Sequence, residues 1–251
     1  MQYGVGGGGT TATILVDAET PVGVINGVNP NFTLGSIPSP VLSLELWKNG
    51  ILQLGAGVDY TLIGNLISYQ AAAIPAGVDN HLAFYRTTNN TVINAVFIPD
   101  EIPVGAINGV NAAYTLANVP NPAASLQLFK NGVLMIAGGV DYTLVGLNIT
   151  YVAAQIPQVG DTHIADYRTS TGVFVNPVFV DAEVPAGVIN GVNAVFTLLF
   201  APNPGASLNL FKNGVFMTPA GVDYTLVGLT ITFVAGQIPA GLDTLVAFYQ
   251  R

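Results

Sequence analysis

The chain has no cysteine, two histidines, one tryptophan and few charged side chains among its 251 residues. Without cysteine it cannot form disulfides, use a thiol nucleophile or bind zinc through thiolates. Charged residues make up 8% of the sequence, against about 25% in an average soluble domain. Its six Lys and Arg residues, in a chain of net charge −8, are too few to neutralise a phosphate backbone, so we expect no nucleic-acid partner.

Long hydrophobic runs are also missing, although 51% of the residues are hydrophobic. The chain has no stretch of about 18 uninterrupted apolar residues, so we expect no membrane-spanning helix and no membrane partner. No basic segment precedes an apolar one at the start, which predicts no signal peptide. A surface with so little charge has little to repel neighbouring molecules. We therefore expect other subunits to cover much of it.

The chain consists mainly of one sequence repeat that occurs three times. "INGVN" begins at residues 25, 107 and 189, and "KNG" and "GVDYTL" recur at the same interval of 82 residues. This period exceeds the roughly 20–50 residues of solenoid repeats, which predicts three small tandem domains over residues 17–87, 88–169 and 170–251. Residues 1–16 are interpreted as a flexible Gly-rich lead and the beginning of a first strand. We expect this strand to comprise residues 11–19 and to be docked. The sequence of the joints between the domains, at 86–101 and 168–183, predicts strands that run into the next domain rather than loose tethers.

Within each unit the pattern is that of β-strands. In the first copy, residues 43–47, 51–54, 59–63, 66–69 and 81–86 alternate between apolar and polar side chains, and 23–26 and 32–34 add two shorter strands. The Asn-Gly pair at 49–50 predicts a tight hairpin of type I′. We interpret "INGVN" as a hairpin turn with positive φ at Gly27, Gly109 and Gly191. The sequence therefore predicts an all-β protein of three tandem small antiparallel β-sandwich domains of immunoglobulin-like style, with about seven strands each.

Potentially catalytic residues form no recognisable set. His81 and His163 occupy equivalent positions, where the third copy has Leu245, which favours a half-buried strand site over a catalytic base. Position 84 changes from Phe84 to Asp166 and back to Phe248, so we expect the last strand to bury Ala83 and Tyr85 more deeply. No nucleophile, base and orienting acid are brought together by any motif. We predict no catalytic residue, no cofactor and no enzymatic activity.

The repeated carboxylates allow two interpretations. Asp59, Asp79 and Glu19, with their counterparts in the other copies, stand at the ends of predicted strands. Asp commonly caps backbone N–H groups in turns, whereas carboxylates at domain joints could instead hold calcium. Because no D-x-D-x-D-G loop is present, we favour capping and predict no metal site.

One aromatic position is the best candidate for binding. Trp47, Phe129 and Phe211 stand at the same place in the three copies, on the strand face opposite Leu44 and Leu46. An exposed aromatic side chain there could contact a ligand such as a sugar, or a partner protein. The alternative is that it packs against the chain's own neighbouring loop or domain.

The unit resembles a β-sandwich module of bacteriophage virion proteins such as tail fibres, head fibres and decoration proteins. The residues that carry the resemblance in the first copy are "INGVNPNFTL", "LELWKNGILQ", "GVDYTLIGNLISY", "IPAGVD" and "FYR". The likeness implies a non-enzymatic structural protein of a virion, assembled in the host cytoplasm, that associates with itself or with other virion proteins. A carbohydrate-binding adhesin that attaches to a host-surface glycan is the alternative, and a hydrolase with an unrecognised site is the third hypothesis.

Overall fold

The computed structural model describes residues 12–89, 95–170 and 177–251. The predicted Gly-rich lead over residues 1–11 lies outside these ranges, as do the middles of both predicted joints. The described parts are all β, with 21 strands in six antiparallel sheets that form three repeated pairs. Short 3-10 turns interrupt the loops, and no α-helix occurs in the described residues, so none there could span a membrane.

Each repeat pairs a four-stranded sheet with a three-stranded sheet. In the first repeat the larger sheet has the order β1 (Ala12–Glu19), β7 (His81–Asn89), β3 (Glu45–Lys48) and β4 (Ile51–Gln53). The smaller sheet has the order β2 (Asn31–Thr33), β6 (Leu66–Tyr69) and β5 (Tyr60–Ile63).

The other two repeats have the same topology. The second repeat contains β8 (Val96–Glu101), β14 (His163–Thr169), β10 (Gln127–Lys130) and β11 (Val133–Met135), with β9 (Ala113–Thr115), β13 (Asn148–Tyr151) and β12 (Tyr142–Val145). The third contains β15 (Phe179–Glu183), β21 (Leu245–Gln250), β17 (Asn209–Lys212) and β18 (Val215–Phe216), with β16 (Val195–Thr197), β20 (Thr230–Phe233) and β19 (Tyr224–Val227). The predicted strand over 11–19 corresponds to β1, which belongs to the first repeat's larger sheet.

The turns follow the sequence signals in part. Asn49 and Gly50 both have positive φ (52° and 75°) and close the β3–β4 hairpin as predicted. Gly27 also has the predicted positive φ of 75°. However, residues 23–26 form no strand. "INGVN" is instead a wide loop in which the Asn26 Oδ1 accepts the N–H groups of Val28 and Asn29, because Asn side chains readily replace backbone partners in turns.

A separate core fills the space between the two sheets of each repeat. In the first repeat, Phe32 and Ile67 of the smaller sheet meet Leu46 and Ala83 of the larger one, and all four are fully buried. Strand alternation points these side chains inward and leaves the opposite face of the larger sheet free for other contacts.

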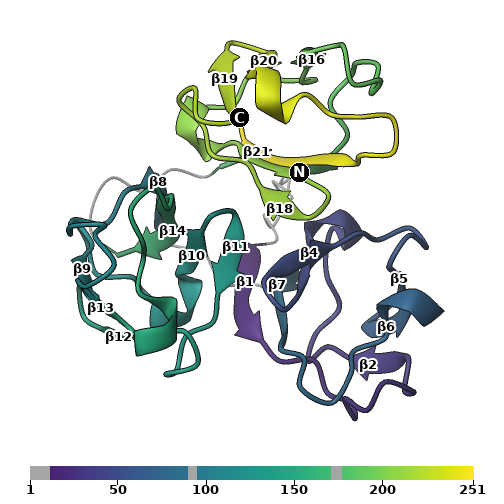
Figure 1. The fold of residues 1–251 in the computed structure, drawn as a ribbon. Coiled ribbons are helices and arrows are strands. Elements are labelled where there is room, and N and C mark those ends of the chain that lie inside the picture. Colours follow the sequence, from purple (N-terminus) through teal and green to yellow (C-terminus); the bar gives the residue numbers. More distant parts are fainter. Residues whose placement is uncertain (1–11, 90–94, 171–176) are drawn as a thin grey trace, which may run out of the picture.

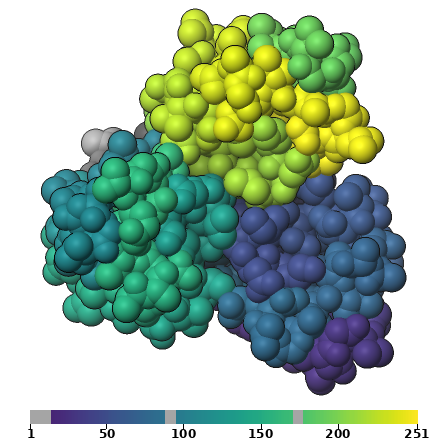
Figure 2. Space-filling view, viewed as in Figure 1, coloured from purple at the N-terminus to yellow at the C-terminus, as the bar shows by residue number. Residues whose placement is uncertain are grey.

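The three repeats close around a common centre. Figure 1 shows them as three lobes, with the larger sheets turned inward and the smaller sheets at the periphery. Figure 2 shows the same lobes in contact with one another around the middle of the molecule. The centre is therefore built from the outward faces of all three larger sheets, and it lies on an approximate threefold axis.

Candidate functional site at the centre of the three repeats

Strand alternation decides which residues reach the centre. Leu44, just before β3, and Leu46 on β3 point into the core of the repeat, so Glu45 and Trp47 point to the axis. On β7, Ala83 and Tyr85 point inward, so Phe84 and Arg86 face the axis. Exposed fractions of 0% for Ala83, 3% for Tyr85 and 7% for Phe84 confirm the predicted order of burial. Position 84 nevertheless lies in a second interior, between the repeats.

An aromatic cluster joins the repeats at one level of the axis. The ring centroids of Trp47, Phe129 and Phe211 lie 5.5–6.5 Å apart, and Phe129 stacks on Phe216 at 4.5 Å. Trp47, Phe129 and Phe211 are each 1% exposed. The surface-binding interpretation of these positions therefore has no support in the structure, which shows them packed against the chain's own neighbouring repeats. Pairs of aromatic rings in this geometry stabilise an interface beyond their buried area.

A ring of backbone hydrogen bonds surrounds this aromatic cluster. The N–H of Leu134 donates to Gly50 O, that of Phe216 to Gly132 O, and that of Leu52 to Gly214 O, with N–O distances of 2.9–3.0 Å. Each hairpin thus donates to the previous repeat and accepts from the next one, with the third repeat followed by the first. The three glycines lie too close to the neighbouring carbonyls to carry a Cβ, which would approach within 2.3–2.4 Å.

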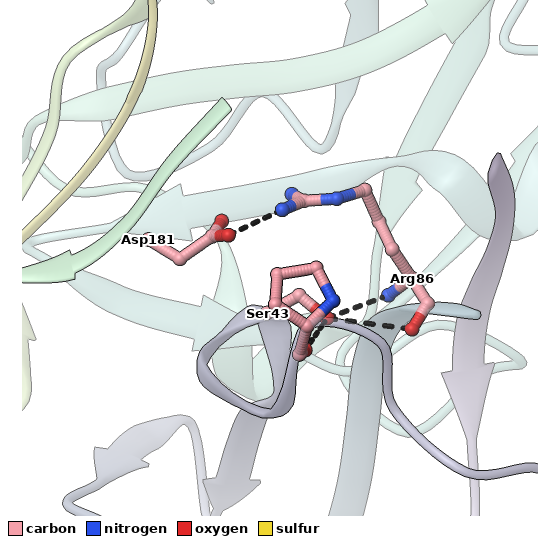
Figure 3. Close-up of polar contacts among 4 residues, drawn as sticks. Ser43, Arg86 and Asp181 are labelled. Carbon is pink, nitrogen blue, oxygen red and sulfur yellow. Dashed lines mark hydrogen bonds and ion pairs between the residues drawn. The ribbon is translucent and has the colours of Figure 1, made fainter. Parts of the chain in front are cut away.

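Two buried ion pairs bridge the repeats at another level. Arg86 of β7 pairs with Asp181 of β15 (Figure 3), and Arg168 of β14 pairs with Asp17 of β1. The Ser43 Oγ accepts the Arg86 N–H at 3.1 Å, which anchors the backbone beneath the guanidinium. Burial raises the pKa of Asp17 and lowers that of Arg168 although the two are paired. Removing the charges from water therefore outweighs their attraction, as is common for buried ion pairs.

The third interface lacks the corresponding pair. The equivalent positions hold Gln250 in place of an arginine and Pro99 in place of an aspartate. Both charges are therefore absent together. This joint change is expected if each Arg is present to pair with its Asp, because either charge alone would be buried without a partner. Arg86, Arg168, Asp17 and Asp181 were not predicted as site residues. Their coordinated loss between copies is the signal in the sequence that could have indicated them.

Three further carboxyl groups lie in the same region without an ion-pair partner in the described residues. Glu45 Oε2 accepts from the Gln127 side chain at 2.9 Å. Asp166 Oδ1 accepts from the N–H of Asp100 at 2.6 Å. The Asp100 Oδ1 and Asp166 Oδ2 atoms are buried and have no hydrogen-bond partner in the part of the chain that the structure describes.

A cavity of about 140 Å³ occupies the polar part of the axis. Glu45, Gln127 and Asn209, which are equivalent in the three copies, line it together with Asp166 and both ion pairs. The described residues offer no group of three or more His, Asp or Glu side chains that could hold a metal ion.

The remaining predicted polar residues have structural partners. His81 and His163 are 3% exposed, which is deeper than predicted, and each lies within hydrogen-bonding distance of a core tyrosine. Asp59 accepts the N–H of Leu54 and Asp79 that of Ala76, each at 2.7 Å, which confirms their capping role. Glu19 accepts from the Tyr85 hydroxyl and the Gly35 N–H, both at 2.6 Å.

Comparisons of the chain with protein-family models, with curated protein sequences and with solved structures gave no match. Its function has to be inferred from its own residues.

Proposed function

We propose that the chain is a non-enzymatic structural protein of a phage particle, a fibre, decoration or tail-associated component that assembles with itself or with other virion proteins. The resemblance of its repeated motifs to virion modules suggests the particle. The three-lobed body, with two ion pairs between its repeats and its turns capped by their own carboxylates, supports a scaffold rather than a reactive site.

One observation carries the assembly part of this proposal. Three outward positions hold valine or isoleucine in every copy and are at least half exposed. They are Val28, Val110 and Val192; Val58, Val140 and Val222; and Ile63, Val145 and Val227. We assign these recurring side chains as the contact positions, and three equal copies would give multivalent attachment.

The carbohydrate-binding alternative is not favoured. It depended on aromatic side chains at the surface, and those at Trp47, Phe129 and Phe211 are buried.

We also propose that each unit is an immunoglobulin-like sandwich with rearranged strand pairing. Two small antiparallel sheets enclose one core, as in that class. The order of strands, 1-7-3-4 and 2-6-5 within a repeat, differs from the 1-2-5-4 and 3-6-7 arrangement of constant-type immunoglobulin domains.

Native mass spectrometry of the full chain at micromolar concentration tests the assembly, and mass spectrometry of purified particles tests the location. We expect oligomers, and we expect the triple variant Val28→Asp, Val110→Asp, Val192→Asp to reduce them. The matched control Ala71→Asp, Ala153→Asp, Ala235→Asp adds the same charge at three exposed, equivalent positions and should leave association unchanged. A wild-type monomer that is also missing from any particle would refute the proposal.

A further inference from the structure

The centre of the molecule contains more acid than base. Within residues 12–89, 95–170 and 177–251, the charged side chains there are five carboxyl groups and two guanidinium groups: Asp17, Glu45, Asp100, Asp166 and Asp181 with Arg86 and Arg168. The two ion pairs satisfy Asp17 and Asp181. Glu45, Asp100 and Asp166 are left, and we call these three side chains the axial carboxyls.

The surroundings of the axial carboxyls offer little to stabilise negative charge. Among the described residues, Arg86 is the cation that favours the ionised form of Glu45, and Asp181 and Asp166 oppose its effect. Asp100 and Asp166 face each other, and the Tyr224 phenol of β19 lies near both. Asn209 of β17 and Gln127 of β10 supply only neutral amides.

The fold itself does not require these acids. At the positions of Asp100 and Asp166, the first repeat has Ala18 and Phe84, and the third has Ala182 and Phe248. These Ala and Phe residues belong to the apolar cluster between the repeats. Glu45 likewise corresponds to Gln127 and Asn209. A neutral side chain therefore fits at every one of these positions, and each acid is particular to one copy.

Burial makes the ionised form of each axial carboxyl unfavourable. It raises the pKa of Glu45 to about 7. Burial also raises the pKa values of Asp100 and Asp166, and the proximity of the two carboxyls to each other raises that of Asp100 further. Two carboxyl groups that share a buried site cannot both ionise readily.

We propose that the axial carboxyls form a proton-controlled latch, which holds the three repeats closed while it is protonated and lets them separate when it ionises. The proposal concerns the isolated chain and is independent of assembly on a particle.

The direction of the effect follows from proton linkage. When the repeats separate, water reaches the carboxyls and their pKa values return to about 4. The closed form therefore binds more protons, so closure is strongest at acidic pH and weakens as the pH rises from about 4 through about 7. Each group that loses its proton in this range shifts the opening equilibrium by at most about tenfold per pH unit.

The chain contains its own reporter of closure. Trp47 is the only tryptophan, and it packs between Phe129 and Phe211 of the other two repeats. Separation of the repeats exposes its indole to water while the core of each repeat stays intact. Its fluorescence maximum and its quenching by acrylamide therefore measure opening directly.

The experiment is a pH titration from 5 to 9 of the full wild-type chain, followed by Trp47 fluorescence and by far-ultraviolet circular dichroism. We expect the emission to shift to longer wavelength and quenching to increase as the pH rises, while the strand signal is retained. The variant Glu45→Gln, Asp100→Ala, Asp166→Phe gives each position the residue of another copy and should remain closed throughout. The backbone tolerates alanine at position 100, because Ala18 and Ala182 have a positive φ of 48°, close to the 53° of Asp100.

Two further variants keep the test decisive. Glu45→Gln alone should move the opening transition to higher pH. The control Asp161→Asn changes a half-buried, capping carboxylate and should not move it. A wild-type chain whose Trp47 stays buried up to pH 9, or a triple variant that opens at the same pH as wild type, would overturn the latch.

Discussion

At the scale of single residues, buried polar groups change between copies in pairs. The Tyr69 hydroxyl lies 2.6 Å from the His81 Nε2, and Tyr151 and His163 form the same contact at 2.8 Å. The third copy has Phe233 and Leu245 at these positions, both buried. Because a buried polar group that loses its partner costs about 1–3 kcal/mol, a joint replacement preserves the core better than a single one.

This pairing predicts a non-additive pair of substitutions. His81→Leu alone should lower the free energy of unfolding of the first repeat by about 1–3 kcal/mol, because it leaves the Tyr69 hydroxyl buried without a partner. Adding Tyr69→Phe should recover most of the loss, which urea denaturation of the two single variants and the double variant would measure. A double variant as unstable as the sum of the single ones would contradict the pairing.

The same histidine gives the stability a dependence on pH. Burial, followed by the nearby Lys48 charge, lowers the pKa of His81 to about 4, whereas in the unfolded chain its pKa is about 6.5. The unfolded chain therefore binds more protons between these values, and this contribution to stability is lost as the pH falls from about 6.5 towards 4. The double variant should lack it.

At the scale of elements, the three tight hairpins do more than connect strands. Each places its glycine carbonyl against the next repeat, where it accepts a backbone hydrogen bond. The Asn-Gly signal in the sequence explains the turn. The Asn-Gly signal does not predict the neighbouring hairpin, whose backbone lies where a Cβ on this glycine would be.

Two glycine substitutions separate these roles. In Gly132→Ala the new Cβ would lie 2.4 Å from Phe216 O, and we expect a loss of about 2–5 kcal/mol together with exposure of Trp47. Gly146→Ala is the matched control, because Gly146 also has positive φ (60°) but nothing lies within 4 Å of its Cβ position. It should cost only about 1–2 kcal/mol of backbone strain and leave Trp47 fluorescence unchanged. Equal exposure of Trp47 in both variants would show that the hairpins do not control closure.

At the scale of the whole molecule, closure brings the outward faces of three sheets into one interior. One level of that interior is aromatic and stabilises the contact between the repeats. The other level is polar, and its buried ion pairs and carboxyl groups are stable only with suitable partners. Two interfaces carry an ion pair and the third has Gln250 and Pro99 instead.

This difference predicts how the ion pairs contribute. Arg168→Gln alone leaves Asp17 buried without a partner and should cost about 3–5 kcal/mol. The double variant Arg168→Gln, Asp17→Pro copies the uncharged interface and should be much closer to wild type. Thermal unfolding of the three variants measures this. If Arg168→Gln alone proves harmless, the ion pair is not needed to neutralise Asp17.

Several features of the fold could be read from the sequence because they depend on local rules. Alternation of apolar residues located most of the strands, and the constant interval of 82 residues indicated three repeated pairs of sheets. Asn-Gly and Gly residues marked turns with positive φ. The strand expected over 23–26 was wrong because the Asn26 side chain, rather than a neighbouring strand, satisfies the backbone there.

The sequence by itself determined the β class, the threefold repetition and which residues share a strand face. Only the tertiary structure decided what the second face of each larger sheet meets. Residues such as Glu45, Trp47, Phe84 and Arg86 mix polar and apolar character, which is equally typical of a solvent-exposed face and of an interface between domains. The distinction arises from closure of the three repeats, which removes these side chains from water and so turns ordinary carboxyls into groups whose charge is costly.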